Sequence, residues 1–165
     1  MSNNSHENIK YSVSKIPKII DNFFISEDTN DKNILKIAKE NNYSLIYNNR
    51  VNGYGSNLKN SLKYSFNKLK ADYAIEVHGD NAQFDPGATY DAIEYLENDY
   101  DFITGSRFLK FKENMQNGYP LERMIPNFFI SNIERIILKI PISDFHQGFK
   151  IYSKKIFNKM DLELM

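Results

Sequence analysis

The stretch Tyr73–Pro86, YAIEVHGDNAQFDP, decides the fold and carries the strongest functional signal in the sequence. Its first residues form an apolar, β-prone run, which predicts a strand over 73–77. The run ends in a cluster of Gly, Asp, Asn and Gln, and Asp85-Pro86 then favours the start of a helix. Ligands of open α/β sheets bind beyond the carboxyl ends of strands. Segment 79–86 is therefore either an ordinary solvated turn, for which these residue types are typical, or part of a ligand site.

The rest of the chain alternates between helical and strand patterns. Helices are expected over 8–16, 33–40, 53–69 and 87–96, and further strands over 19–25, 43–47 and 100–104. Strands separated by helices of about ten to fifteen residues indicate βαβ units. We therefore predict one α/β domain over residues 1–165, with a mainly parallel, Rossmann-like sheet flanked by helices.

Right-handed crossovers would bring the polar loops that follow the strands to one rim of this sheet. These loops are the acidic turn 26–31, the turn Gly53–Gly55, segment 79–86 and the turn Gly105–Arg107.

Composition excludes several classes of function. Lys and Arg together number 21, as do Asp and Glu, so the chain lacks the basic field of a protein that binds nucleic acid. Cysteine is absent, which excludes disulfides, thiolate metal sites and a cysteine nucleophile. Residues 1–10 lack the apolar core of a signal peptide, and no run approaches the roughly 20 apolar residues of a membrane span. We expect a soluble, cytoplasmic domain.

Several segments together resemble the family 2 glycosyltransferases of GT-A fold. In chain order they are NNRVNGYGSNLKNSL (48–62), VHGDNAQFDP (77–86), DFITGSRF (101–108), YPLERMIPNFF (119–129) and SDFHQGFKIYS (143–153). The resemblance extends over about residues 6–160, and within the family it is greatest to the dolichyl-phosphate mannose synthase-like branch, which acts on polyprenyl phosphates. It implies a nucleotide-sugar donor (UDP- or GDP-linked), a divalent metal and inversion at the anomeric carbon.

The resemblance implies a Mg²⁺ or Mn²⁺ site in segment 79–86. Relatives carry Asp-x-Asp or His-Pro-Asp-x-Gln, whereas here Asp80 is the only carboxylate before Gln83. We expect Asp80 to be the chief metal ligand and Gln83 a helper, with Asn81 at the second Asp position. The ion would offset the charge that grows on the departing nucleoside diphosphate.

The same resemblance implies the donor-binding residues. Glu27 and Asp28 would face the base and ribose, although their turn is equally suited to an N-cap region. Gly53 and Gly55 would permit close approach of the backbone to the donor. His146 would touch the diphosphate or the metal, but a lone histidine is as readily structural.

Arg107 and Arg123 would bind the acceptor phosphate, because guanidinium binds phosphate through paired hydrogen bonds. The alternative for Arg107 is a surface salt bridge. A phosphate acceptor is already anionic and needs positioning more than a strong base, whereas Asp144 or Asp80 could serve as the base for a hydroxyl acceptor. Segment 124–142 is either an amphipathic segment that makes peripheral contact with a membrane or a core-packing helix.

Compared with the family, the chain begins with a polar segment and ends early. We therefore expect the first family strand to be missing or replaced, in a fragment or in a reduced domain whose sheet a second copy or a partner chain completes. Two alternatives to transfer onto a polyprenyl phosphate follow. The chain is a catalytically silent fragment or assembly subunit, or it is a transferase with a saccharide acceptor.

Overall fold

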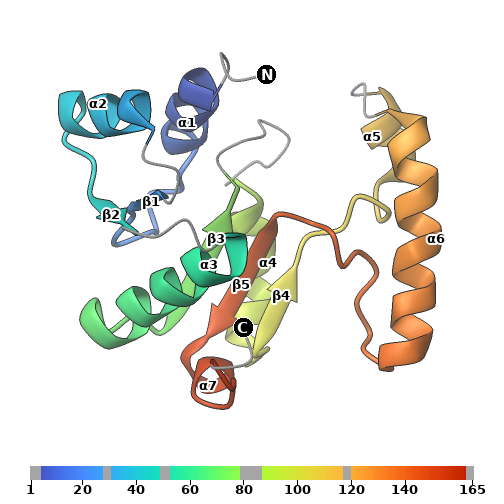
Figure 1. Cartoon of the computed structure of the whole chain (residues 1–165). Helices are drawn as coiled ribbons and strands as arrows, with labels where there is room; N and C mark the ends of the chain where they lie inside the picture. Colours follow the sequence, from blue (N-terminus) through green and yellow to red (C-terminus); the bar gives the residue numbers. More distant parts are fainter. Residues whose placement is uncertain (1–4, 28–30, 49–52, 79–86, 117–119, 163–165) are drawn as a thin grey trace.

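The computed structural model describes residues 5–27, 31–48, 53–78, 87–116 and 120–162. Helices and strands alternate along this part of the chain, as Figure 1 shows. In order they are α1 (Ser5–Ser14), β1 (Ile25–Glu27), α2 (Lys32–Glu40), β2 (Leu45–Tyr47), α3 (Gly53–Lys63), the π-helical turn η1 (Tyr64–Lys68), β3 (Tyr73–Val77), α4 (Ala88–Glu97), β4 (Phe102–Thr104), α5 (Phe111–Gln116), α6 (Leu121–Leu138), β5 (Phe149–Ser153) and α7 (Lys154–Phe157).

The strands form two sheets within the described residues. Strands β1 and β2 pair in parallel, while the larger sheet has the order β3-β5-β4. Strand β5 runs antiparallel to both neighbours, with Ile151 opposite Ile75 and Ile103, so β3 and β4 run parallel to each other. The predicted α/β class is confirmed. Among the described strands, parallel hydrogen-bonded pairing is limited to β1 and β2, because β5, a strand that sequence reasoning missed, lies between β3 and β4.

The larger sheet is covered by helices on both faces. Side chains alternate between the two faces along each strand, so each face contributes side chains to a separate core. On one face, α4 supplies Ala92 to a core that includes Phe149 and Ile151. On the other, α3 and η1 supply Leu62 and Phe66, which pack with residues of β3, β5 and α7: Ala74, Tyr152 and Phe157. This arrangement holds β3 between two cores and fixes the place where its carboxyl end emerges.

Most predicted elements agree with the structure, and the strand expected over 73–77 has those bounds. The strand expected over 19–25 is wrong except at its end, since only Ile25 belongs to β1. The apolar residues before it are used for side-chain packing instead of backbone pairing. The ring centroids of Phe23 and Tyr43 are 5.5 Å apart, and those of Phe24 and Tyr64 are 5.1 Å apart.

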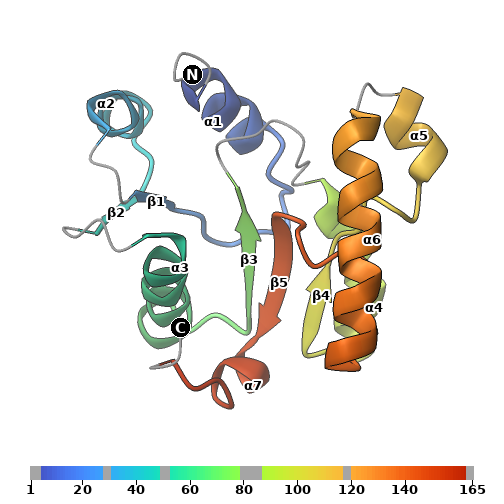
Figure 2. The same cartoon turned by 45° about the vertical axis from the view of Figure 1, so that its right-hand side comes forward.

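Helix α6 stands at the β4 side of the larger sheet, as Figure 2 shows. Its buried residues are Met124 and Ser131. Apart from Met124, its large apolar side chains are exposed, among them Ile136 at 73% and Ile137 at 70%. The core-packing interpretation of this segment is therefore wrong. No helix in the described part of the chain has the length and apolar character to cross a membrane.

Candidate functional site

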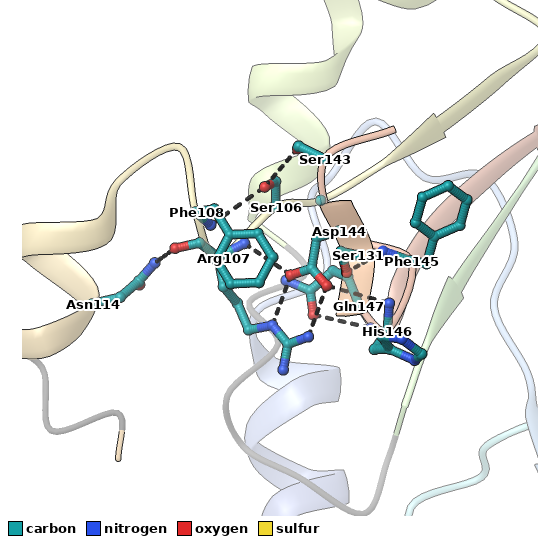
Figure 3. Close-up of polar contacts among 12 residues, drawn as sticks. Ser106, Arg107, Phe108, Asn114, Ser131, Ser143, Asp144, Phe145, His146 and Gln147 are labelled. Carbon is teal, nitrogen blue, oxygen red and sulfur yellow. Dashed lines mark hydrogen bonds and ion pairs between the residues drawn. The ribbon is translucent and has the colours of Figure 1, made fainter. Parts of the chain in front are cut away.

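A buried ion pair joins the loop after β4 to the loop before β5. The Arg107 guanidinium donates from Nε to Asp144 Oδ2 and from Nη2 to Oδ1, both over 2.7 Å. Two backbone amides, those of Arg107 and His146, also donate to this carboxylate. The Asp144 side chain is 0% exposed and that of Arg107 is 15% exposed. Figure 3 shows the carboxylate enclosed by these donors.

This geometry decides two of the sequence hypotheses. The alternative for Arg107, a salt bridge, is observed with Asp144, but the pair is buried and bidentate and does not lie at the surface. The hypothesis that Asp144 serves as a base for a hydroxyl acceptor does not fit this structure. Both of its oxygens accept charge-assisted hydrogen bonds and the side chain has no exposed surface, so a substrate hydroxyl has no access to it.

The loop 143–148 is held by further contacts on both of its sides, as Figure 3 shows. Ser143 Oγ donates to Ser106 Oγ over 2.7 Å, and the amide of Phe145 donates to the buried Ser131 of α6 over 3.4 Å. His146 Nε2 lies 3.1 Å from Glu134 Oε2, also on α6. The loop therefore ties the Arg107 turn to α6. The contact with Glu134 gives His146 a structural partner in addition to its expected role at the donor.

A second polar cluster surrounds Glu76, near the carboxyl end of β3. Its Oε1 accepts from the hydroxyl of Tyr54, in the first turn of α3, and lies 3.2 Å from His78 Nε2. Its Oε2 accepts from the Tyr152 hydroxyl over 3.0 Å and lies 4.0 Å from Lys150 Nζ. We name Glu76 with these partners the Glu76 cluster.

The electrostatics of the Glu76 cluster favour an ionised carboxylate. Burial opposes ionisation, but hydrogen bonds from His78, Tyr54 and Tyr152 and the charge of Lys150 outweigh it, so the pKa of Glu76 lies below its ordinary value of 4.5. Burial and the neighbouring carboxylate raise the pKa of the Tyr54 and Tyr152 hydroxyls, which therefore remain donors. An ionised carboxylate only accepts, so His78 Nε2 is the donor in its contact.

A network of amides connects the smaller sheet to α3. Asn57 Oδ1 accepts from Ser26 Oγ on β1 and from Asn48 Nδ2, just after β2, over 2.6 Å. Asn60 Nδ2 donates to Asn48 Oδ1 over 2.8 Å. Sequence reasoning missed both this network and the Glu76 cluster. The spacing of Asn57 and Asn60 on one helix face is the signal that could have found the network.

Of the predicted donor set, Glu27, Gly53 and Gly55 lie where β1 ends and α3 begins, whereas His146 lies in the loop before β5, beside α6. Glu27 is buried at the end of β1. Gly53 has φ +78°, a left-handed conformation that favours glycine, and a Cβ at Gly55 would meet no atom within 4 Å beyond the backbone of its own helix. Arg123 lies exposed in the first turn of α6. Asp28, Asp80, Asn81 and Gln83 fall outside the described residues.

The predicted metal ligands are among these undescribed positions. Within the described ranges, no group of three or more His, Asp or Glu side chains could hold a metal ion. The carboxylate of Asp80 and the amide oxygen of Gln83 are hard oxygen ligands of the kind that Mg²⁺ and Mn²⁺ prefer, and Mg²⁺ commonly binds few carboxylates together with substrate phosphates.

The α/β fold, with a β3-β5-β4 sheet between helical layers, is consistent with the GT-A fold of glycosyltransferases. A family model described as Glycosyl transferase family 2 matches residues 7–161. The chain therefore belongs to the family 2 glycosyltransferases. Membership implies transfer of a sugar from a nucleotide-sugar donor to an acceptor.

Proposed function

We propose that this glycosyltransferase transfers the sugar of a UDP- or GDP-sugar to a polyprenyl phosphate, with inversion at the anomeric carbon. The observation that carries the proposal is the outward apolar face of α6, which bears Arg123 in its first turn. A polyprenyl phosphate combines an anionic head with a long apolar tail. It requires cationic groups beside an apolar surface of this kind, at the cytoplasmic face of a membrane.

Contacts between α6 and the loop 143–148 support the assignment of Arg107 to the same acceptor. Ser131 and Glu134 of α6 bind this loop, and Asp144 of the loop binds Arg107. The bidentate pair holds the guanidinium in one orientation. A preoriented guanidinium loses less conformational freedom when it binds a phosphate than a mobile one does.

The pairing of Asp144 is also compatible with an acceptor that needs no strong base. A phosphate monoester is anionic near neutral pH, so its oxygen can attack the anomeric carbon once it is positioned. The bond from that carbon to the nucleoside diphosphate breaks as the new bond forms. In the proposed roles, Arg107 and Arg123 orient the acceptor phosphate and limit its repulsion from the donor phosphates.

The donor assignment follows the family. Asp80, with Gln83, would hold Mg²⁺ or Mn²⁺, which when bound stabilises the negative charge of the leaving nucleoside diphosphate. The proposed donor-binding residues are Glu27, Asp28, Gly53, Gly55, Asn81 and His146. The left-handed backbone of Gly53 favours glycine at the start of α3 and is compatible with close approach of the backbone to the donor.

The proposal is tested by transfer assays with UDP- and GDP-sugars, Mn²⁺ and either a polyprenyl phosphate or a free saccharide as acceptor. We expect a glycosyl polyprenyl phosphate as product, and loss of its formation in Asp80→Ala but not in Asp91→Ala, an exposed control on α4. Transfer to the saccharide alone would replace the acceptor assignment. A folded protein that binds neither UDP nor GDP would support the catalytically silent alternative.

A further inference from the structure

The Glu76 cluster lies at the start of α3 and at the carboxyl end of β3. Both places are candidates for facing the donor. Tyr54 stands between Gly53 and Gly55, the glycines proposed to approach the donor, and His78 directly follows β3. The two rings are in edge contact, with centroids 5.2 Å apart. One carboxylate therefore holds the start of α3 and the carboxyl end of β3 together.

We propose that Glu76 is a positioning residue that holds Tyr54 and His78 in place for the nucleotide-sugar donor. The inference rests on the proposed function, because it takes the start of α3 and the end of β3 as donor-facing. It assigns to Glu76 no contact with the reacting atoms. Its effect is expected on donor affinity, through the side chains that it holds.

The two oxygens of the Glu76 carboxylate contact different parts of the cluster. Oε1 serves the donor-facing side, since its partners are Tyr54 and His78. Oε2 serves the sheet, since its partners are Tyr152 and Lys150 of β5. Tyr152 also packs in the core between the sheet and α3, whereas half of Tyr54 is exposed.

Lys150 strengthens the hold on Tyr54. Its ammonium lies 5.7 Å from the centroid of the Tyr54 ring and 3.3 Å from its hydroxyl, which it can approach because Lys150 is the cross-strand partner of Glu76. The Tyr54 ring is thus restrained at its hydroxyl by Glu76 and Lys150 and at its side by His78. A half-exposed aromatic side chain restrained in this way is preorganised, which lowers the cost of ordering it on binding.

The division between the oxygens provides a matched pair of variants. Tyr54→Phe and Tyr152→Phe each remove one hydroxyl from the same carboxylate, one on the donor-facing side and one on the sheet side. Glu76→Gln keeps the shape of the side chain and removes its charge. Each variant is titrated calorimetrically with UDP and GDP in the presence of Mn²⁺, and its thermal unfolding is measured in parallel.

We expect Tyr54→Phe to weaken binding of the preferred nucleotide about fivefold, as for the loss of one hydrogen bond, and Glu76→Gln to weaken it at least as much. Tyr152→Phe should lower the midpoint of thermal unfolding but leave the affinity unchanged. If the wild-type protein binds a nucleotide and the Tyr54→Phe and Tyr152→Phe variants bind it with equal affinity, the positioning role is overturned and the proposed function is not. Absence of binding by the folded wild-type protein would instead overturn the proposed function.

Discussion

Arg107 and Asp144 are separated by 37 positions in the sequence, yet the guanidinium of one forms two hydrogen bonds of 2.7 Å to the carboxylate of the other. The pair joins the loop that leaves β4 to the loop that enters β5. Because the carboxylate is fully buried, the opposite charge of each side chain offsets the cost of removing the other from water. The pair is therefore both a structural joint and the support of a proposed phosphate-binding residue.

Removal of one partner of this pair is expected to be costly. Asp144→Asn leaves the guanidinium without its counter-charge and should lower the free energy of unfolding by about 3 to 5 kcal/mol, as for other broken buried pairs. Urea unfolding of Asp144→Asn, Arg107→Met and the double variant measures this. We expect the double variant to lose less than the sum of the single losses. Strict additivity would show that the two side chains do not stabilise each other.

Glu76 should make stability depend on pH in the acid range. Its pKa in the folded protein is lower than 4.5, so its contribution is present above that pH and is lost as the pH falls through the folded value. The facing groups are Tyr54 on α3, His78, and Lys150 and Tyr152 on β5. Urea unfolding of the wild-type protein and of Glu76→Gln on both sides of pH 4.5 should show a smaller acid loss for the variant. Parallel pH profiles would contradict this.

The outward face of α6 should be dispensable for folding but not for contact with lipid. Ile133→Ser with Ile136→Ser replaces exposed side chains, and such changes usually alter stability by less than about 0.5 kcal/mol. Sedimentation with vesicles that contain a polyprenyl phosphate should show weaker binding by this variant. Met124→Ser, at a fully buried position of the same helix, is the contrasting control and should destabilise the fold. Unchanged vesicle binding combined with altered self-association would assign the face to a second copy.

Gly105 is expected to tolerate no larger residue without loss of stability. A Cβ at this position would lie 3.1 Å from Gln147 Cγ, and the side chain of Gln147 is itself held by the amide of Gly148 over 2.9 Å. Gly105→Ala should therefore cost about 1 kcal/mol in urea unfolding. Gly55→Ala, where a Cβ meets open space within α3, should instead be neutral or stabilising. If Gly55→Ala lost more stability than Gly105→Ala, the Gln147 side chain would move aside freely.

Local patterns predicted the elements that local forces determine. The apolar run 73–77 and the helical spacing over 53–69 are properties of neighbouring residues, and both correspond to observed elements. The antiparallel insertion of β5 between β3 and β4 depends on contacts across 45 or more positions, which a single sequence does not display. The aromatic residues before β1 look like a strand because aromatic residues favour strands and side-chain packing alike.

The candidate site was predictable in part for the same reason. Arg107 follows a strand in a glycine-containing turn, which marks it as a functional candidate, but its partner Asp144 comes from a distant loop. Glu76 lies inside a strand and gives no motif signal. Its importance arises from residues of α3 and β5 that only the fold brings to it.

The separation into two sheets has a consequence for the motions of the molecule. In the described residues the smaller sheet shares no strand pairing with the larger one, and its link to α3 includes the side-chain contacts of Ser26, Asn48 and Asn57. Side-chain links of this kind are weaker than a continuous ladder of backbone hydrogen bonds. Amide protons of β1 and β2 should therefore exchange with solvent through local openings, before those of β3 and β5, which exchange only when the larger sheet comes apart.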